Sequence, residues 1–166
     1  MTLFELMVAM AVGGILLTAV LSLSTYSGRS LAGLANYVAL NSDSRIALDR
    51  MTREIRQSGY LTGYQTNRLS FIDFDGQPLV YEYHPAERAL TRTKMDQKEI
   101  LLADCDSVNF EIFKCNPIKG SYDHALATTA LSSKVIRLSF TCSRTLLGVK
   151  MNTESIQTAK VVVRKN

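Results

Sequence analysis

The pattern of apolar and polar residues divides the chain into an apolar beginning, an amphipathic continuation and a long remainder with strand-like alternation. No charged residue occurs from Leu6 to Gly28. A stretch of about 20 apolar residues is long enough to span a bilayer. A signal peptide would carry positive charge before the apolar run, whereas residues 1–5 contain Glu5 and no Lys or Arg. The pattern therefore favours a transmembrane or assembly helix.

Helix-forming sequence continues behind the apolar run, and no proline occurs before Pro78. Apolar residues recur there at steps of three and four, as on one face of a helix. Gly59 stands where a C-cap glycine is expected. We therefore predict a single helix from Thr2 to Ser58, roughly 85 Å long. The two sets of apolar positions are Leu31, Leu34 and Val38, and Leu48, Met51 and Ile55.

With this helix in place, the chain divides into three parts. Residues 1–28 form its hydrophobic half, which projects into lipid or against other helices, and residues 29–60 form its amphipathic half. Residues 61–166 are predicted to form a globular antiparallel β domain that covers the amphipathic half. The fold class is α+β, with a long N-terminal helix packed on an antiparallel sheet.

Glu5 is the residue that a simple membrane anchor does not explain. Near the bilayer centre an acidic side chain costs roughly 2.5–3.5 kcal/mol on insertion scales, so we expect a partner for it. The α-ammonium of Met1 is the nearest cation, and the α-ammonium of a neighbouring copy would serve equally well. This interpretation points to self-assembly.

Gly13 and Gly14 lie inside the apolar half and allow two interpretations. Small residues let membrane helices approach one another closely. Alternatively, the pair is a weak point at which the helix can stretch, because each interior glycine costs roughly 1 kcal/mol relative to alanine.

After Gly63 the apolar period changes to two, which indicates strands. Asp75-Gly76 is a hairpin turn signal. We expect a single antiparallel meander, with a long loop at 116–134. The predicted strands are 69–74, 78–83, 89–93, 108–115, 135–142 and 159–164, with an ambiguous segment at 99–103.

The three cysteines show no metal-ligand spacing. If the strands 108–115 and 135–142 are antiparallel neighbours, Cys115 opposes Val135 and Cys105 lies near Cys142. Cys115 would then be roughly 23 Å from Cys142, too far for a disulfide. We predict a Cys105–Cys142 bridge with Cys115 free, and three unpaired cysteines remain the alternative.

Composition and charge exclude little else. The chain has 166 residues, 46% of them hydrophobic, and a net charge of +4. This charge is too small to indicate nucleic-acid binding by itself.

No arrangement of residues typical of catalysis and no glycine-rich phosphate loop is present. Asp73 and Asp75 beside Gly76 resemble half of a calcium loop, but no Glu follows at the required distance, so we interpret them as a turn. We predict no enzymatic activity, no metal and no cofactor.

The run Met1-Thr2-Leu3-Phe4-Glu5-Leu6, followed by the apolar segment 7–23, resembles the mature N-terminus of type IV pilins and type II secretion pseudopilins. The segment 53–60 is similar to the helix end of the minor pilin W and pseudopilin J branch, and 161–166 is similar to its closing strand. One departure is Ser22, near which many major pilins carry a proline.

The resemblance implies a ladle-shaped pilin fold and a set of partners. Met1 would be exposed by prepilin peptidase after leader cleavage and then N-methylated. Glu5 would pair with the Met1 amine of an adjacent subunit in a helical homo-oligomeric filament. The chain would lie in the inner membrane before the pilus assembly machinery moves it into an extracellular filament, or into a periplasmic pseudopilus.

The leading hypothesis is therefore a structural subunit of a type IV pilus-like filament. The first alternative is a minor tip pilin or a secretion pseudopilin that acts in adhesion, DNA uptake or secretion. A bitopic membrane protein that never polymerises is the other alternative.

Overall fold

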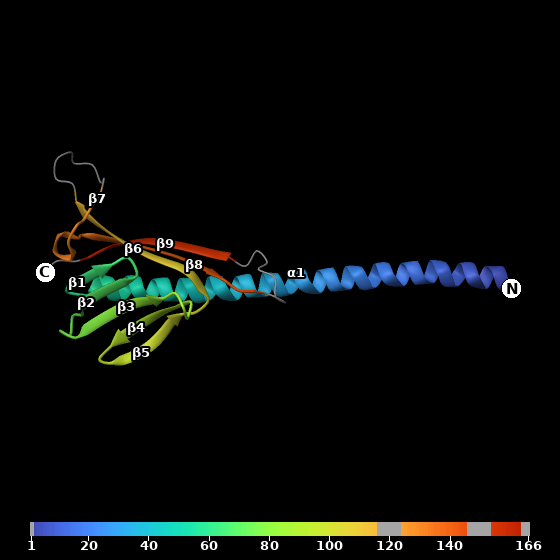
Figure 1. The fold of residues 1–166 in the computed structure, drawn as a ribbon, viewed down its shortest axis with the longest axis horizontal. Coiled ribbons are helices and arrows are strands. Elements are labelled where there is room, and N and C mark those ends of the chain that lie inside the picture. Colours follow the sequence, from blue (N-terminus) through green and yellow to red (C-terminus); the bar gives the residue numbers. More distant parts are fainter. Residues whose placement is uncertain (1, 116–123, 146–153, 164–166) are drawn as a thin grey trace.

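In the computed structural model the protein has the shape of a ladle, with a long helical stem and a β-rich head at one end (Figure 1). The structure describes residues 2–115, 124–145 and 154–163. The helix α1 runs from Leu3 to Gln57, two residues shorter than predicted. We call residues 3–39 of α1 the stem, and the rest of α1 with the strands the head. The predicted α+β class is confirmed.

The helix begins with a capping box formed by Thr2 and Glu5. The backbone N–H of Thr2 donates to the Glu5 carboxylate at 2.8 Å, and the N–H of Glu5 donates to the Thr2 hydroxyl at 3.4 Å. Each bond satisfies a backbone donor that the first turn leaves unpaired.

The predicted glycine cap at the other end of α1 is wrong. Ser58 is the C-cap in extended conformation, and its hydroxyl donates to the carbonyl of Ile55 at 2.7 Å. Gly59 continues directly toward the sheet, and its N–H donates to the carbonyl of Ile72 at 2.9 Å. Among the described glycines only Gly76 has a positive φ, in the turn that Asp75-Gly76 predicted. The helix ends without a left-handed residue because the serine hydroxyl caps one of its last carbonyls.

The head contains two antiparallel sheets, not the single meander that we predicted (Figure 1). The first has the strand order β1-β2-β3-β4-β5 and the second the order β7-β6-β8-β9. The predicted loop at 116–134 contains β7 and the short 3-10 helix η1. The strands are β1 (Tyr60–Gln65), β2 (Arg68–Ile72), β3 (Pro78–His84), β4 (Ala89–Lys94), β5 (Gln97–Leu102), β6 (Cys105–Cys115), β7 (His124–Leu126), β8 (Val135–Ser143) and β9 (Glu154–Val162), and η1 spans Ala130–Ser132.

The pairing of β6 with β8 differs from the predicted register by two residues. Phe113 opposes Val135, and Cys115 pairs instead with His124 of β7. A bulge between Cys105 and Ser107 shifts the register again. Because of this bulge, Cys105 and Cys142 oppose each other directly, so their predicted proximity is confirmed.

One face of α1 forms the centre of the head's core, together with both sheets. Its fully buried apolar residues are Leu40, Ala47, Met51 and Ile55. Leu48 packs at the edge of this core, so the second predicted face is confirmed. The first predicted face, which contains Leu34, is exposed.

A charged cluster fixes α1 to the first sheet. The Glu54 carboxylate accepts hydrogen bonds from the Tyr81 hydroxyl and from Arg92, the latter at 2.8 Å. Burial alone would raise the pKa of Glu54, but these two bonds and the charges of Arg92 and Arg50 outweigh burial and lower it. Arg50 also binds Glu99 of β5 through two bonds of 2.8 and 3.0 Å.

We expect Glu54→Ala to lower the free energy of unfolding by about 2 kcal/mol, since it leaves the charged Arg92 and the Tyr81 hydroxyl without their acceptor. Urea unfolding of the full chain in detergent, followed by tyrosine fluorescence, measures the change. Glu99→Ala is the matched control, because its carboxylate is exposed and exposed pairs contribute little. Equal effects of the two substitutions would contradict this role of Glu54.

Candidate assembly interface

The Glu5 carboxylate lies exposed on the first turn of α1. It accepts a hydrogen bond from the backbone N–H of Thr2, and the positive end of the helix macrodipole favours a carboxylate at this position. Met1 and its amine lie outside the described residues, so the pairing of Glu5 with a Met1 amine stays a prediction. Sequence reasoning missed Thr2, although the spacing Thr-x-x-Glu is the signature of a capping box.

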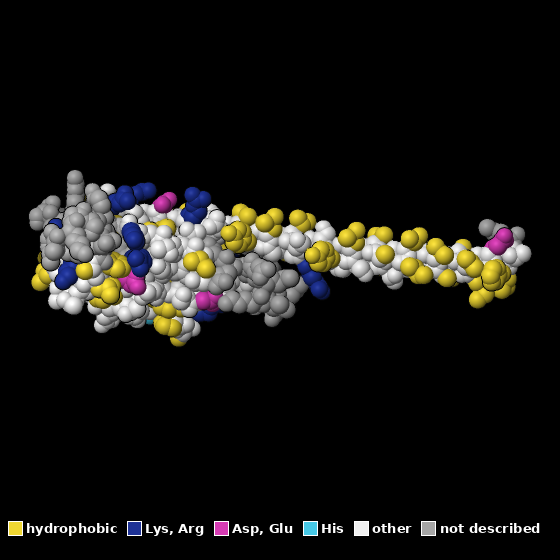
Figure 2. Space-filling view, turned by 90° about the horizontal axis from the view of Figure 1, so that it is seen from above, with side chains coloured by type: hydrophobic (Ala, Val, Ile, Leu, Met, Phe, Trp, Pro, Cys, Tyr) yellow, Lys and Arg dark blue, Asp and Glu magenta, His cyan; other side chains and the backbone are white. Residues whose placement is uncertain are grey.

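Behind Glu5 the stem carries no charge as far as Gly28, and every residue of this stretch is exposed. Its large apolar side chains, from Leu3 to Leu23, are all exposed, and Figure 2 shows them along its whole length. By length and composition α1 is able to cross a membrane, and none of the residues in its most apolar part is buried. The stem therefore presents an apolar surface that water does not favour.

Three hydroxyl groups inside this segment find their acceptors within the helix. The hydroxyls of Thr18, Ser22 and Thr25 donate to the carbonyls of Ile15, Thr18 and Ser22 at 2.8–2.9 Å. A hydroxyl with such a partner can enter an apolar environment at low cost. Ser22 therefore fits a buried helix as well as an apolar residue would.

Gly13 and Gly14 lie in regular helix within the stem. A methyl group added at either position would meet no atom within 4 Å. Neither glycine therefore serves side-chain packing within a single described chain, which leaves close contact with other helices and a weak point for stretching as their two possible roles.

The apolar surface continues beyond the length of a bilayer as a stripe formed by Leu31, Leu34 and Val38, which we call the stem stripe. These side chains are 65%, 60% and 58% exposed. At 3.6 residues per turn they point roughly 135° away from the face that α1 buries in the head. The stem stripe lies about 50 Å along α1 from its beginning, whereas the hydrocarbon core of a bilayer is about 30 Å thick.

Cys105 and Cys142 are both buried, with their sulfur atoms 3.3 Å apart. The hydrogen bond with Cys142, together with burial, raises the pKa of the Cys105 thiol. The two cysteines are free in this structure, and the side chain of Cys115 lies outside the described residues. Direct cross-strand opposition places the thiols close enough for a disulfide after a small movement.

We expect a small disulfide such as oxidised glutathione to accept two electrons from these thiols, which lose two protons and form the Cys105–Cys142 bond. The bond should raise the free energy of unfolding by about 2–4 kcal/mol, because it closes a long loop in the unfolded chain. Non-reducing peptide mapping and urea unfolding measure both effects. Cys115→Ser should change neither result, and a bridge through Cys115 would refute the pairing.

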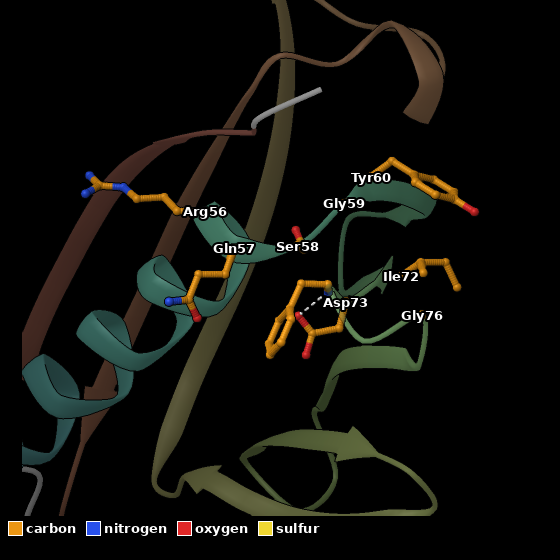
Figure 3. A pocket seen from close by; sticks show the side chains of 9 residues that line it. Arg56, Gln57, Ser58, Gly59, Tyr60, Ile72, Asp73 and Gly76 are labelled. Atoms are coloured by element: carbon orange, nitrogen blue, oxygen red, sulfur yellow. Dashed lines mark hydrogen bonds between the residues drawn. The ribbon is translucent and has the colours of Figure 1, made fainter. Parts of the chain in front are cut away.

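A pocket of about 570 Å³ lies at the end of α1 that is farthest from the stem, between Gln57 and the β2–β3 turn. Figure 3 shows that Arg56 and Tyr60 point away from the side chains of Gln57 and Asp73, so the polar groups around the pocket do not converge. The turn itself is held by Lys94, whose ammonium binds the carboxylates of Asp73 and Asp75. This pairing gives both aspartates a structural role in the turn.

Within the described ranges, no three His, Cys, Asp or Glu side chains are placed to hold a metal ion. The chain matches no protein-family model, and no curated protein is similar to it.

Proposed function

We propose that the chain is a structural subunit of a type IV pilus-like extracellular filament, in which the stems of many copies pack together. The observation that carries this proposal is the stem stripe, which is apolar, uncovered and on the side of α1 that faces away from the head. Burying an apolar side chain of this size contributes about 1.5–3 kcal/mol. Stems packed side by side would bury the stripes and leave the heads outside.

The length of the apolar surface favours this proposal over a membrane anchor that never polymerises. A bilayer of about 30 Å covers some 20 residues of helix, and the segment Leu3–Leu23 already supplies them. A simple anchor would leave the stem stripe in water. A bundle of parallel stems would bury both the segment Leu3–Leu23 and the stem stripe.

The proposal also gives Glu5 a partner. In a bundle the exposed carboxylate would meet the Met1 amine of a neighbour, and each group would neutralise the other in an apolar surrounding. Met1 would be generated by prepilin peptidase and N-methylated. The chain would reside in the inner membrane until the pilus assembly machinery adds it to the filament.

A minor subunit at the filament tip, or a pseudopilin of type II secretion, is the second candidate. It is favoured by Ser22, which occupies the region where many major pilins carry a proline, and by the resemblance of residues 53–60 to the W and J branch. Such a subunit would use the same stem, and its head would contact surfaces, DNA or secreted proteins. Mass spectrometry of sheared filaments distinguishes the candidates by the abundance of this chain.

We expect Leu34→Asp to reduce the yield of filaments at least tenfold without changing the amount of chain in the membrane. The introduced charge would be buried against a neighbouring stem. Each tenfold decrease in the association constant corresponds to about 1.4 kcal/mol of binding free energy. Electron microscopy and immunoblots of sheared filaments and of membranes measure the two quantities. Thr158→Asp, on an exposed site of β9, is the matched control. A normal filament yield from the Leu34 variant would contradict the proposal.

We expect Glu5→Ala to lower assembly at least tenfold as well, because it leaves the amine of a neighbour unpaired in an apolar bundle. The same shearing assay applies, and Asp49→Asn on the exposed face of α1 is the matched loss of a carboxylate. If the Glu5 variant assembles as the wild type does, the charge pair is not what joins the subunits.

A further inference from the structure

A second uncovered apolar surface lies on the head, in a groove of about 240 Å³ between α1 and β5. Ile46 of α1 and Ile100 of β5 line it from different elements and are 65% and 63% exposed. Leu40 and Leu102 also line the groove and belong to the core. We call this surface the head groove. Two exposed β-branched side chains beside one groove form an apolar site that the described residues of the head leave open.

Charged pairs lie on both sides of the apolar centre of the head groove. Asp43, one turn before Ile46, is 3.6 Å from Arg144. Arg50, one turn after Ile46, holds Glu99. An apolar centre with a polar rim is the usual arrangement of a protein interface.

We propose that the head groove receives the stem stripe of a second copy of this chain, an inference that rests on the proposed filament. A contact between two different surfaces is heterologous, and when it does not close into a ring it repeats as an open helical series. The described chain offers such a pair, since the stripe and the groove lie on different parts of the molecule.

The sequence around the stem stripe makes it a suitable occupant of the head groove. From Ser30 to Ser42 no side chain is charged. This segment can therefore enter the groove without burying an ion, whose uncompensated burial is costly. The Asp43–Arg144 and Arg50–Glu99 pairs would remain at the edge of the contact, where water still reaches them.

The geometry of α1 sets the relation between the two copies. The centre of the stripe and Ile46 are about twelve residues apart along the helix, so a parallel neighbour must be displaced by about 18 Å along the axis. The mean direction of the stripe and the direction of Ile46 differ by about 90° around the helix, so placing one against the other requires a rotation of about a quarter turn between the copies. A displacement combined with a rotation is a screw operation, as a helical filament requires.

A photocrosslinking amino acid with a benzophenone side chain, placed at position 100, tests the contact in filaments from cells that produce the full chain. The copy with the photoprobe also carries Ser42→Ala and is expressed together with wild-type copies. Trypsin releases residues 30–45 as one peptide, because Arg29 and Arg45 bound it. The substitution lowers the mass of this peptide by one oxygen, so its mass shows from which copy it comes.

We expect position 100 to crosslink to peptide 30–45 with the wild-type mass. We also expect Ile100→Glu to lower filament yield about tenfold, and Thr158→Glu, at an exposed site outside the groove, to leave it unchanged. A photoprobe at Leu16 in the stem reports assembly independently of the groove. If position 16 gives crosslinks between copies but position 100 gives only crosslinks within one copy or to other segments, the groove inference is wrong and the filament stands. If neither position crosslinks two copies, both proposals fail.

Discussion

Burial of one face of α1 against the two sheets is the interaction on which the whole structure depends. Leu40, Ala47, Met51 and Ile55 of α1 occupy the centre of the core, together with buried residues of both sheets. The Glu54 cluster fixes the position and orientation of α1 on the first sheet, because the bonds of Glu54 to Tyr81 and Arg92 form only in one arrangement of the helix. The apolar contacts supply most of the stabilisation, and the polar cluster selects one packing arrangement of the helix on the sheet.

The same helix provides a second surface because only its last third is enclosed. Where the head ends, the side of α1 that carries Leu31, Leu34 and Val38 is apolar and open. One continuous element thus links the folding of the head to the exposure of the stem. A change that loosens α1 in the head would alter the direction in which the stem projects, and with it any packing of stems.

The sequence was sufficient for features that depend on local pattern. The helix, the Asp75-Gly76 turn and most strands follow from periodicity and from turn residues. The proximity of Cys105 and Cys142 followed from assuming that two alternating segments pair. The number of sheets did not follow, because alternation is the same in one sheet and in two, and the bulge at Cys105–Ser107 leaves no local signal.

Other errors came from competing local signals. Gly59 suggested a glycine cap, but the hydroxyl of Ser58 performs the capping and the glycine approaches the carbonyl of Ile72. At the candidate interface, Glu5 and the glycine pair could be singled out from the sequence. The head groove could not, since Ile46 and Ile100 are 54 positions apart and are brought together only by the fold.

The continuity of α1 has a mechanical consequence. No linker separates the stem from the head, so a pull between the two ends acts along the hydrogen bonds of a single helix, which are loaded in series. Under such a load the weakest turn opens first, and the glycine pair at 13–14 weakens its turn by roughly 1 kcal/mol for each residue. That turn lies far from the head, and stretching there would lengthen the molecule while the sheets and the core stay intact. The ladle would behave as an extensible tether with a rigid load at one end.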